Sequence, residues 1–317
     1  MKFTLPARPP FNFLSVINSH GWRQLAPFSY VESTNTLSYV LRLSNGRVIE
    51  LHFRGAAEGV SLETEKLDRT ERREVTDKVT WMFGLDMDFS LFYAASRGEV
   101  KLVHAKKLAR GRVLRSPTVF EDVIKTILTT NTLWAATKNM TLKLVNELGE
   151  PLQSTGRVVP NDSEGRTLVP HDLLSKSSAG AETKAFPTPE AIAASSPDFL
   201  KEKIRVGYRA PAIHQLAVRI ASGKFDLESL KTSELTTLEL RKELLTINGV
   251  GPYAAANLLM ILGKHDFIPI DSYALKMVSN EWYRGEPITA KEVEKRFEKW
   301  GEFKGLAFWF WDWKDNG

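Results

Sequence analysis

The feature that most constrains this chain is Gly-Val-Gly-Pro at residues 249–252, which separates two apolar segments, residues 244–247 and 253–262. Two glycines one residue apart permit a tight turn with positive φ, and Pro252 presets helical φ at the start of a second helix. The sequence therefore predicts a helical hairpin. Amides at the start of its second helix would attract an anion such as a nucleic-acid phosphate. Alternatively, the hairpin has only a packing role.

A second signal, Pro269-Ile270-Asp271, follows the second predicted helix. Pro269 keeps the segment before it from being helical, and Asp271 can cap a helix that starts at Ser272. The carboxylate thus comes out of an apolar run close in sequence to the hairpin. Asp271 is either a simple helix cap or a fixed negative charge beside an anion-binding turn.

The combination of apolar helix, Gly-x-Gly hairpin, small-residue helix and Pro-x-Asp resembles the helix-hairpin-helix (HhH-GPD) superfamily of base-excision DNA glycosylases. Residues 111–121, 127–132, 207–210 and 305–309 are similar to further recurrent segments of that superfamily. The resemblance extends from about residue 101 to the C-terminus. In pattern it is closest to the alkyladenine (3-methyladenine) DNA glycosylases.

The implied fold class is α+β, with a small N-terminal antiparallel-sheet domain, residues 1–100, before a mainly helical two-lobe HhH-GPD domain, residues 101–317. The residue pattern agrees, because residues 37–43 and 48–53 alternate around a turn and therefore predict a β-hairpin. Residues 154–184 are rich in Ser, Gly and charge and have no periodicity, so we expect a mobile insertion there.

Helical spacing predicts several helices with defined ends. One is expected over residues 75–83, with continuation to residue 93 after a glycine, and another over residues 134–148. Ser116 is the expected cap of the helix that carries residues 119–128, with Pro117 at its first position, and Thr188 is the expected cap of a later helix.

The resemblance also implies roles for individual residues. Asp271 would be the catalytic carboxylate, and the backbone of Gly249, Val250 and Gly251 would bind a DNA phosphate. Asn131 matches the residue that fills the gap left in the duplex by a flipped base. The alternative for Asn131 is a cap for the helix that follows it.

Tyr253 is the most informative departure from the family pattern. Bifunctional members carry a lysine at this position, and that lysine forms a Schiff base, which a tyrosine cannot do. We therefore expect no lyase step and assign Tyr253 to the pocket for the flipped base. Trp309, Trp311 and Trp313 either contribute to the same pocket or pack in the core.

Charge supplies a weaker signal. The formal net charge is +5, and residues 101–115 hold six basic residues and no acid. Such a run is the electrostatic footprint of a phosphate-binding surface, which predicts that Arg110 and Arg112 contact DNA. The alternative is a solvated surface that binds nothing.

Composition excludes several classes of protein. The chain has no cysteine, which removes disulfides, thiolate catalysis and the iron–sulfur cluster of some family members. The N-terminus lacks a signal-peptide core, so we expect a cytoplasmic or nucleoid protein, or a nuclear one in a eukaryote. We expect no cofactor and no metal site, although the hairpin could hold a monovalent cation.

These observations predict a monomeric, monofunctional DNA glycosylase that flips a damaged base from duplex DNA and hydrolyses its N-glycosidic bond, with alkylated purines as the expected substrate class. Two alternatives remain at this stage. One is a bifunctional glycosylase for oxidised bases. The other is a structure-specific DNA-binding protein without enzymatic activity.

Overall fold

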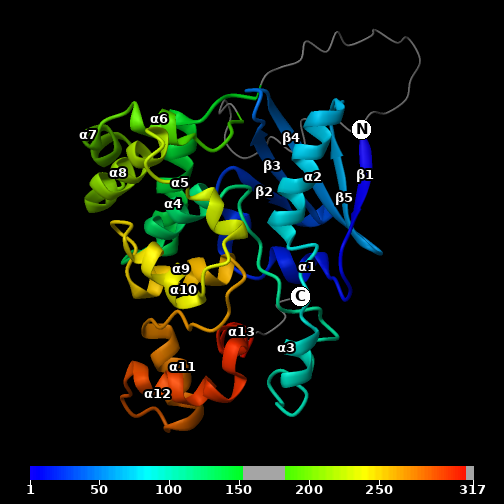
Figure 1. Ribbon diagram of the computed structural model, residues 1–317, viewed down its shortest axis with the longest axis vertical. Helices are drawn as coiled ribbons and strands as arrows, with labels where there is room; N and C mark the ends of the chain where they lie inside the picture. Colours follow the sequence, from blue (N-terminus) through cyan, green and yellow to red (C-terminus); the bar gives the residue numbers. More distant parts are fainter. Residues whose placement is uncertain (153–182, 312–317) are drawn as a thin grey trace.

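A computed structural model of the chain describes residues 1–152 and 183–311, in which an antiparallel sheet stands beside a larger helical body (Figure 1). The sheet has five strands in the order β1-β5-β4-β3-β2. Their bounds are β1 (Lys2–Pro6), β2 (Phe28–Val31), β3 (Thr36–Arg42), β4 (Val48–Ala56) and β5 (Gly59–Thr64). The predicted α+β class is confirmed.

The β3–β4 hairpin follows the predicted pattern. Tyr39 pairs with Leu51 and Leu37 with Phe53, so apolar side chains of both strands lie on the same buried face. Helix α2 (Arg69–Phe83) crosses the sheet in Figure 1 and buries Val75 and Val79. It ends at Gly84, whose φ of 57° is left-handed.

The expectation that the helix continues through residues 85–93 is wrong. The chain leaves the helix at Gly84, and a separate short helix, α3 (Ser90–Ala95), follows. Residues 154–184 of the expected insertion lie outside the described residues, apart from 183 and 184.

The remaining helices form the body beside and below the sheet (Figure 1). They are α1 (Phe13–Ile17), α4 (Val119–Thr129), α5 (Trp134–Leu148), α6 (Pro189–Ala193), α7 (Pro197–Phe199), α8 (Ala210–Ala221), α9 (Thr237–Leu245), α10 (Pro252–Ile261), α11 (Ser272–Trp282), α12 (Ala290–Phe297) and α13 (Lys304–Trp309). Short 3₁₀ turns are η1 (Gly21–Gln24), η2 (Glu32–Thr34), η5 (Gly207–Arg209), η6 (Glu228–Thr232) and η7 (Glu298–Phe303), and η4 (Leu200–Ile204) is a π-helical turn.

Two of the predicted helix starts can be compared with the structure. Thr188 caps α6 as predicted, by accepting a hydrogen bond from the Ala191 N–H at 3.2 Å. Ser116 does not cap α4. Thr118 does, and it accepts from the Glu121 N–H at 3.2 Å. The reason is that Ser116 is fully buried and its hydroxyl accepts from the Lys125 ammonium instead.

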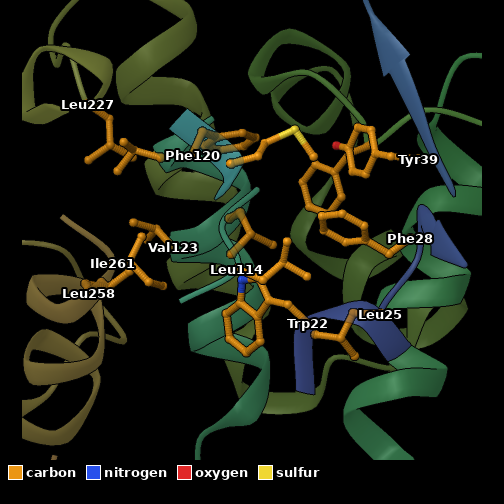
Figure 2. Packing of buried hydrophobic residues seen from close by; sticks show 14 of the residues in the cluster. Trp22, Leu25, Phe28, Tyr39, Leu114, Phe120, Val123, Leu227, Leu258 and Ile261 are labelled. Atoms are coloured by element: carbon orange, nitrogen blue, oxygen red, sulfur yellow. The ribbon is translucent and has the colours of Figure 1, made fainter. Parts of the chain in front are cut away.

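The sheet and the helical body share one core. Phe53 of β4, Val123 of α4 and Leu258 of α10 belong to the same buried cluster. Figure 2 shows Trp22 and Phe28 from the N-terminal half packed beside Leu114 and Val123. A second core joins Phe92 of α3 and Leu102 to Val278 and Phe297, on α11 and α12. The predicted domain boundary near residue 100 falls inside this second core and stays a prediction.

Helix α4 is the centre of the first core and carries a buried ionic network. Lys125, fully buried, donates to Glu121 at 2.6 Å, and Glu121 accepts from the Tyr39 hydroxyl of β3 at 2.6 Å. One helical turn of spacing places Glu121 and Lys125 on the same face. Because each charge is paired inside the protein, the network tolerates burial that would otherwise be costly.

Replacing Lys125 with Met tests this pairing. Met keeps most of the apolar stem but leaves the Glu121 carboxylate buried without its cation, so we expect a loss of about 3–5 kcal/mol in unfolding free energy. Urea denaturation measures it. Lys138→Met, on the exposed side of α5, is the matched control and should change stability by less than about 0.5 kcal/mol. Equal effects of both variants would contradict a structural role for the ion pair.

Among the described residues, no helix has both the length and the apolar character needed to cross a membrane. In the same residues no group of three or more His, Asp or Glu side chains is arranged to hold a metal ion.

Candidate active site

A cavity of about 330 Å³ opens between η1, helices α4, α5 and α10, and the segment before α11. Its lining combines aromatic, aliphatic and hydroxyl-bearing residues, and Asp271 is its one acidic residue. The lining residues are His20, Gly21, Trp22, Val113, Thr126, Thr129, Thr132, Trp134, Thr137, Tyr253, Asn257, Met260, Ile261, Asp271 and Trp309. A neighbouring cavity of about 300 Å³ shares Tyr253, Asn257, Asp271 and Trp309 with it.

The predicted hairpin joins α9 to α10 at one border of this cavity. Gly249 has a φ of 85°, and a Cβ there would lie 3.2 Å from the Ala212 Cβ, so the turn requires glycine. The Val250 side chain is buried and anchors the hairpin in the core, which leaves only its backbone for an outside ligand. Gly251 is the N-cap of α10 and faces open space. An anion could approach the start of α10 here.

Asp271 is a helix cap, as one of the two alternatives expected, and it also lies at the cavities. Its carboxylate caps α11 by accepting from the Ala274 N–H at 2.9 Å, and the same half-buried residue lines both cavities. The structure brings it together with Tyr253, on the first turn of α10. Burial raises the pKa of the Tyr253 hydroxyl, and the negative charge of Asp271 raises it further. Tyr253 therefore stays protonated beside a carboxylate.

Four heteroaromatic rings line the cavity, and each has its N–H hydrogen-bonded to protein. Trp22 Nε1 donates to Asp122 at 2.7 Å, Trp134 Nε1 to Gln24 at 3.0 Å and Trp309 Nε1 to the Ser19 carbonyl at 2.9 Å. The fourth ring is His20. A bound molecule would therefore meet ring faces and carbon edges rather than ring N–H donors.

His20 has a fixed neutral form. Its Nε2 lies 2.6 Å from the Leu114 carbonyl, which can only accept, so Nε2 carries the proton and donates. Its Nδ1 then accepts from the Trp22 N–H at 3.3 Å. Burial lowers the pKa of His20 to about 4, with a small contribution from the Lys125 charge. His20 is thus neutral at physiological pH and offers no free nitrogen to the cavity.

The cavity floor connects to the ionic network of α4. Asp122 accepts from Trp22 Nε1 and, at 3.0 Å, from the Ser116 N–H. Burial raises the pKa of Asp122 to about 7, which the hydrogen bonds from Ser116 and Trp22 partly oppose. His20, Trp22, Trp134 and Asn257 were not predicted from the sequence. The first three carry no recognisable spacing signal, and Asn257 lies one turn after Tyr253 on α10.

Asn131 lies in the loop between α4 and α5, at the border of the cavity. It is exposed, has a φ of 46°, and its amide lies 3.4 Å from the hydroxyl of Tyr208, which is also exposed. The alternative that Asn131 caps the next helix is not what the structure has, because Leu133 is the N-cap of α5. Leu133 is 81% exposed and makes no capping hydrogen bond. The gap-filling role of Asn131 stays a prediction.

The interpretation of Arg110 and Arg112 as DNA contacts is corrected by their burial, since both side chains lie inside the protein. Arg112 donates at 2.6–2.8 Å to four backbone carbonyls, which belong to Gly84, Pro10, Arg8 and Met87. The partners of Arg112 are thus backbone carbonyl oxygens and not carboxylates, so the lack of acids in residues 101–115 did not mean that this side chain is exposed.

Of the C-terminal tryptophans, Trp309 lines the cavity, Trp311 packs in the second core, and Trp313 lies outside the described residues.

The lowered pKa of His20 predicts a pH dependence of stability. Between its ordinary value of 6.5 and about 4, the unfolded chain binds a proton that the folded protein does not. The free energy of unfolding is therefore not reduced by His20 above pH 6.5, and it decreases as the pH is lowered from 6.5 towards 4. His20→Asn should flatten the slope of unfolding free energy against pH in this window by up to about 1.4 kcal/mol per unit. Parallel pH profiles in urea denaturation would contradict it. His265, whose pKa burial lowers to about 3, contributes equally to both proteins.

The chain is similar in sequence to known DNA repair proteins. Residues 124–303 match the family model described as HhH-GPD superfamily base excision DNA repair protein. A protein of Methanocaldococcus jannaschii named as a DNA repair glycosylase is 31% identical over 106 residues, which are 32% of this chain and 48% of that protein. The match thus spans about half the length of this relative.

Two solved structures show the same fold at low sequence identity. The 3-methyladenine DNA glycosylase of Archaeoglobus fulgidus is 21% identical with a TM-score of 0.71, over 98% of this chain and 97% of that one. The 8-oxoguanine glycosylase/lyase of Clostridium acetobutylicum is 19% identical with a TM-score of 0.67, over 95% and 91%. The sheet and the helical body are therefore both part of a fold shared with these proteins.

Proposed function

Because the chain belongs to the HhH-GPD superfamily of base excision DNA repair proteins, we propose that it is a monofunctional DNA glycosylase that excises alkylated purines from duplex DNA. The duplex would be held at the hairpin, where the start of α10 offers a site for a phosphate. The exposed loop with Asn131 and Leu133 borders the same cavity and would face the base stack. The damaged base must leave the stack before its bond can be attacked.

Asp271 is the proposed catalytic carboxylate. As the C1′–N bond breaks, its electron pair leaves with the base and C1′ takes on oxocarbenium character. A carboxylate fixed by its capping hydrogen bond stabilises this positive charge and can accept a proton from the water that adds to C1′. Its place at the border of two adjoining cavities leaves room for a base and a water molecule.

The proposed substrate class is supported by the absence of a strong proton donor among the residues that line the cavity. His20 is neutral with both nitrogens engaged, the Tyr253 pKa is raised, and no Lys or Arg belongs to the lining residues. A neutral purine would therefore leave as an anion without a proton from a Lys, Arg or His side chain. An N-alkylated purine already carries a positive charge, is attracted by ring faces, and leaves as a neutral molecule. The observation that carries the proposal is a lining with several aromatic rings and no Lys, Arg or protonated His; its other polar groups are the hydroxyls of Tyr253 and four threonines and the amide of Asn257.

Tyr253 supports a reaction that stops at the abasic strand. A phenol cannot form a Schiff base, and neither Lys264 nor Lys276 lines either cavity. Water is then the nucleophile that remains.

The wild-type protein should release free 3-methyladenine from a methylated duplex and leave the strand intact until alkali is added. Rates on matched duplexes with 8-oxoguanine or hypoxanthine should be lower, because these bases are neutral. Single-turnover assays with product separation measure both points. A covalent adduct after borohydride would show a lyase instead, and binding without base release would indicate a DNA-binding protein.

Asp271→Asn separates catalysis from helix capping. Asn keeps a capping oxygen but removes the charge, so we expect a loss in single-turnover rate on the order of 10²–10³. Thermal stability should change by only a few tenths of a kcal/mol, since Asn caps about as well as Asp. Asp68→Asn at the N-cap of α2 is the matched control and should keep the wild-type rate. Near-normal excision by a folded Asp271→Asn protein would refute the assignment.

A further inference from the structure

The three tryptophans of the cavity differ in what holds their indole N–H. Trp22 donates to the buried carboxylate of Asp122, and Trp309 donates to a backbone carbonyl. Trp134 donates to the side chain of Gln24, an exposed residue with free rotatable bonds. Of the three tryptophans, Trp134 is therefore the one whose N–H is held by a flexible, exposed side chain.

Trp134 also lies directly against the backbone of η1. A Cβ on Gly21 would lie 2.2 Å from its ring, so the ring occupies the space that any other residue would fill. Gly21 and Gln24 belong to η1, in the N-terminal half, whereas Trp134 is the first residue of α5. One face of the ring is thus fixed by Gly21, and its N–H edge is directed by Gln24.

We propose that Gln24 is a positioning residue that sets base specificity by holding the Trp134 N–H away from the flipped base. The inference rests on the proposed function. Gln24 does not line the cavity itself, so it acts through Trp134. Its oxygen completes the set of acceptors that leaves the cavity without ring N–H donors. The Trp and His rings of such a pocket have no free N–H to donate to a carbonyl oxygen on a purine.

Removal of Gln24 should change which bases are accepted. Without Gln24, the Trp134 N–H can donate to water or to an acceptor on the bound base that displaces this water. The O6 atom of hypoxanthine can supply that acceptor, and 3-methyladenine has no carbonyl. Freeing the Trp134 N–H should therefore favour hypoxanthine relative to 3-methyladenine. If Gln24 had only a structural role, its removal would lower the excision rates of both bases together or change neither rate.

The test is the ratio of single-turnover rates on hypoxanthine and 3-methyladenine in otherwise equal duplexes. In Gln24→Leu we expect this ratio to rise on the order of three- to tenfold, the value of one net hydrogen bond. Gln24→Glu keeps an acceptor and should keep the wild-type ratio. In a Trp134→Phe background, which lacks the N–H, Gln24→Leu should leave the ratio unchanged.

Three outcomes would overturn the inference: an unchanged ratio in Gln24→Leu, equal loss of both rates, or the same shift in the Trp134→Phe background. The wild-type rate on 3-methyladenine tests the proposed function separately. If the wild-type protein excises neither base, the proposed function is wrong, but the inference about Gln24 is still testable. The inference is then judged by the ratio of affinities for the two free bases, measured by quenching of tryptophan fluorescence.

Discussion

The arrangement of this protein depends on the charged side chains buried in α4. Glu121, Asp122 and Lys125 all lie inside the protein, and their hydrogen bonds link α4 to β3, to η1 and to Ser116. Through Tyr39 the network reaches the sheet, and through Trp22 it reaches the floor of the cavity. Hydrophobic packing alone would bring these elements together, but charged partners of fixed geometry also define their register, because an unpaired buried charge is far more costly than a shifted apolar contact.

The sequence was most informative where structure is decided locally. The hairpin at Gly249, the end of α5 and the Asp271 cap each depend on residues within a few positions of each other, and all three lie where they were expected. The α+β class and the β3–β4 hairpin followed from periodicity for the same reason. One helix start was wrong: Thr118 caps α4 in place of Ser116, whose hydroxyl accepts from the buried Lys125 ammonium later in the same helix.

The parts of the site that could not be predicted are those formed across long sequence separations. Trp134 meets Gln24, and Trp22 meets Asp122, across about a hundred residues, and no spacing rule connects them. Charge was misleading for a related reason. A run without acids looked exposed, yet Arg112 is paired with backbone carbonyls, which a charge count does not register. Single-sequence patterns give the identity of a candidate carboxylate but not the surroundings that decide its chemistry.

The capping hydrogen bond on Asp271 determines at which stage its side chain loses conformational entropy. A free aspartate samples several rotamers, and selecting one of them during a reaction adds to the activation barrier. Here the Ala274 N–H has already selected an orientation when α11 forms, so that ordering belongs to the folding of the chain. In the proposed reaction each turnover therefore begins with the carboxylate already oriented.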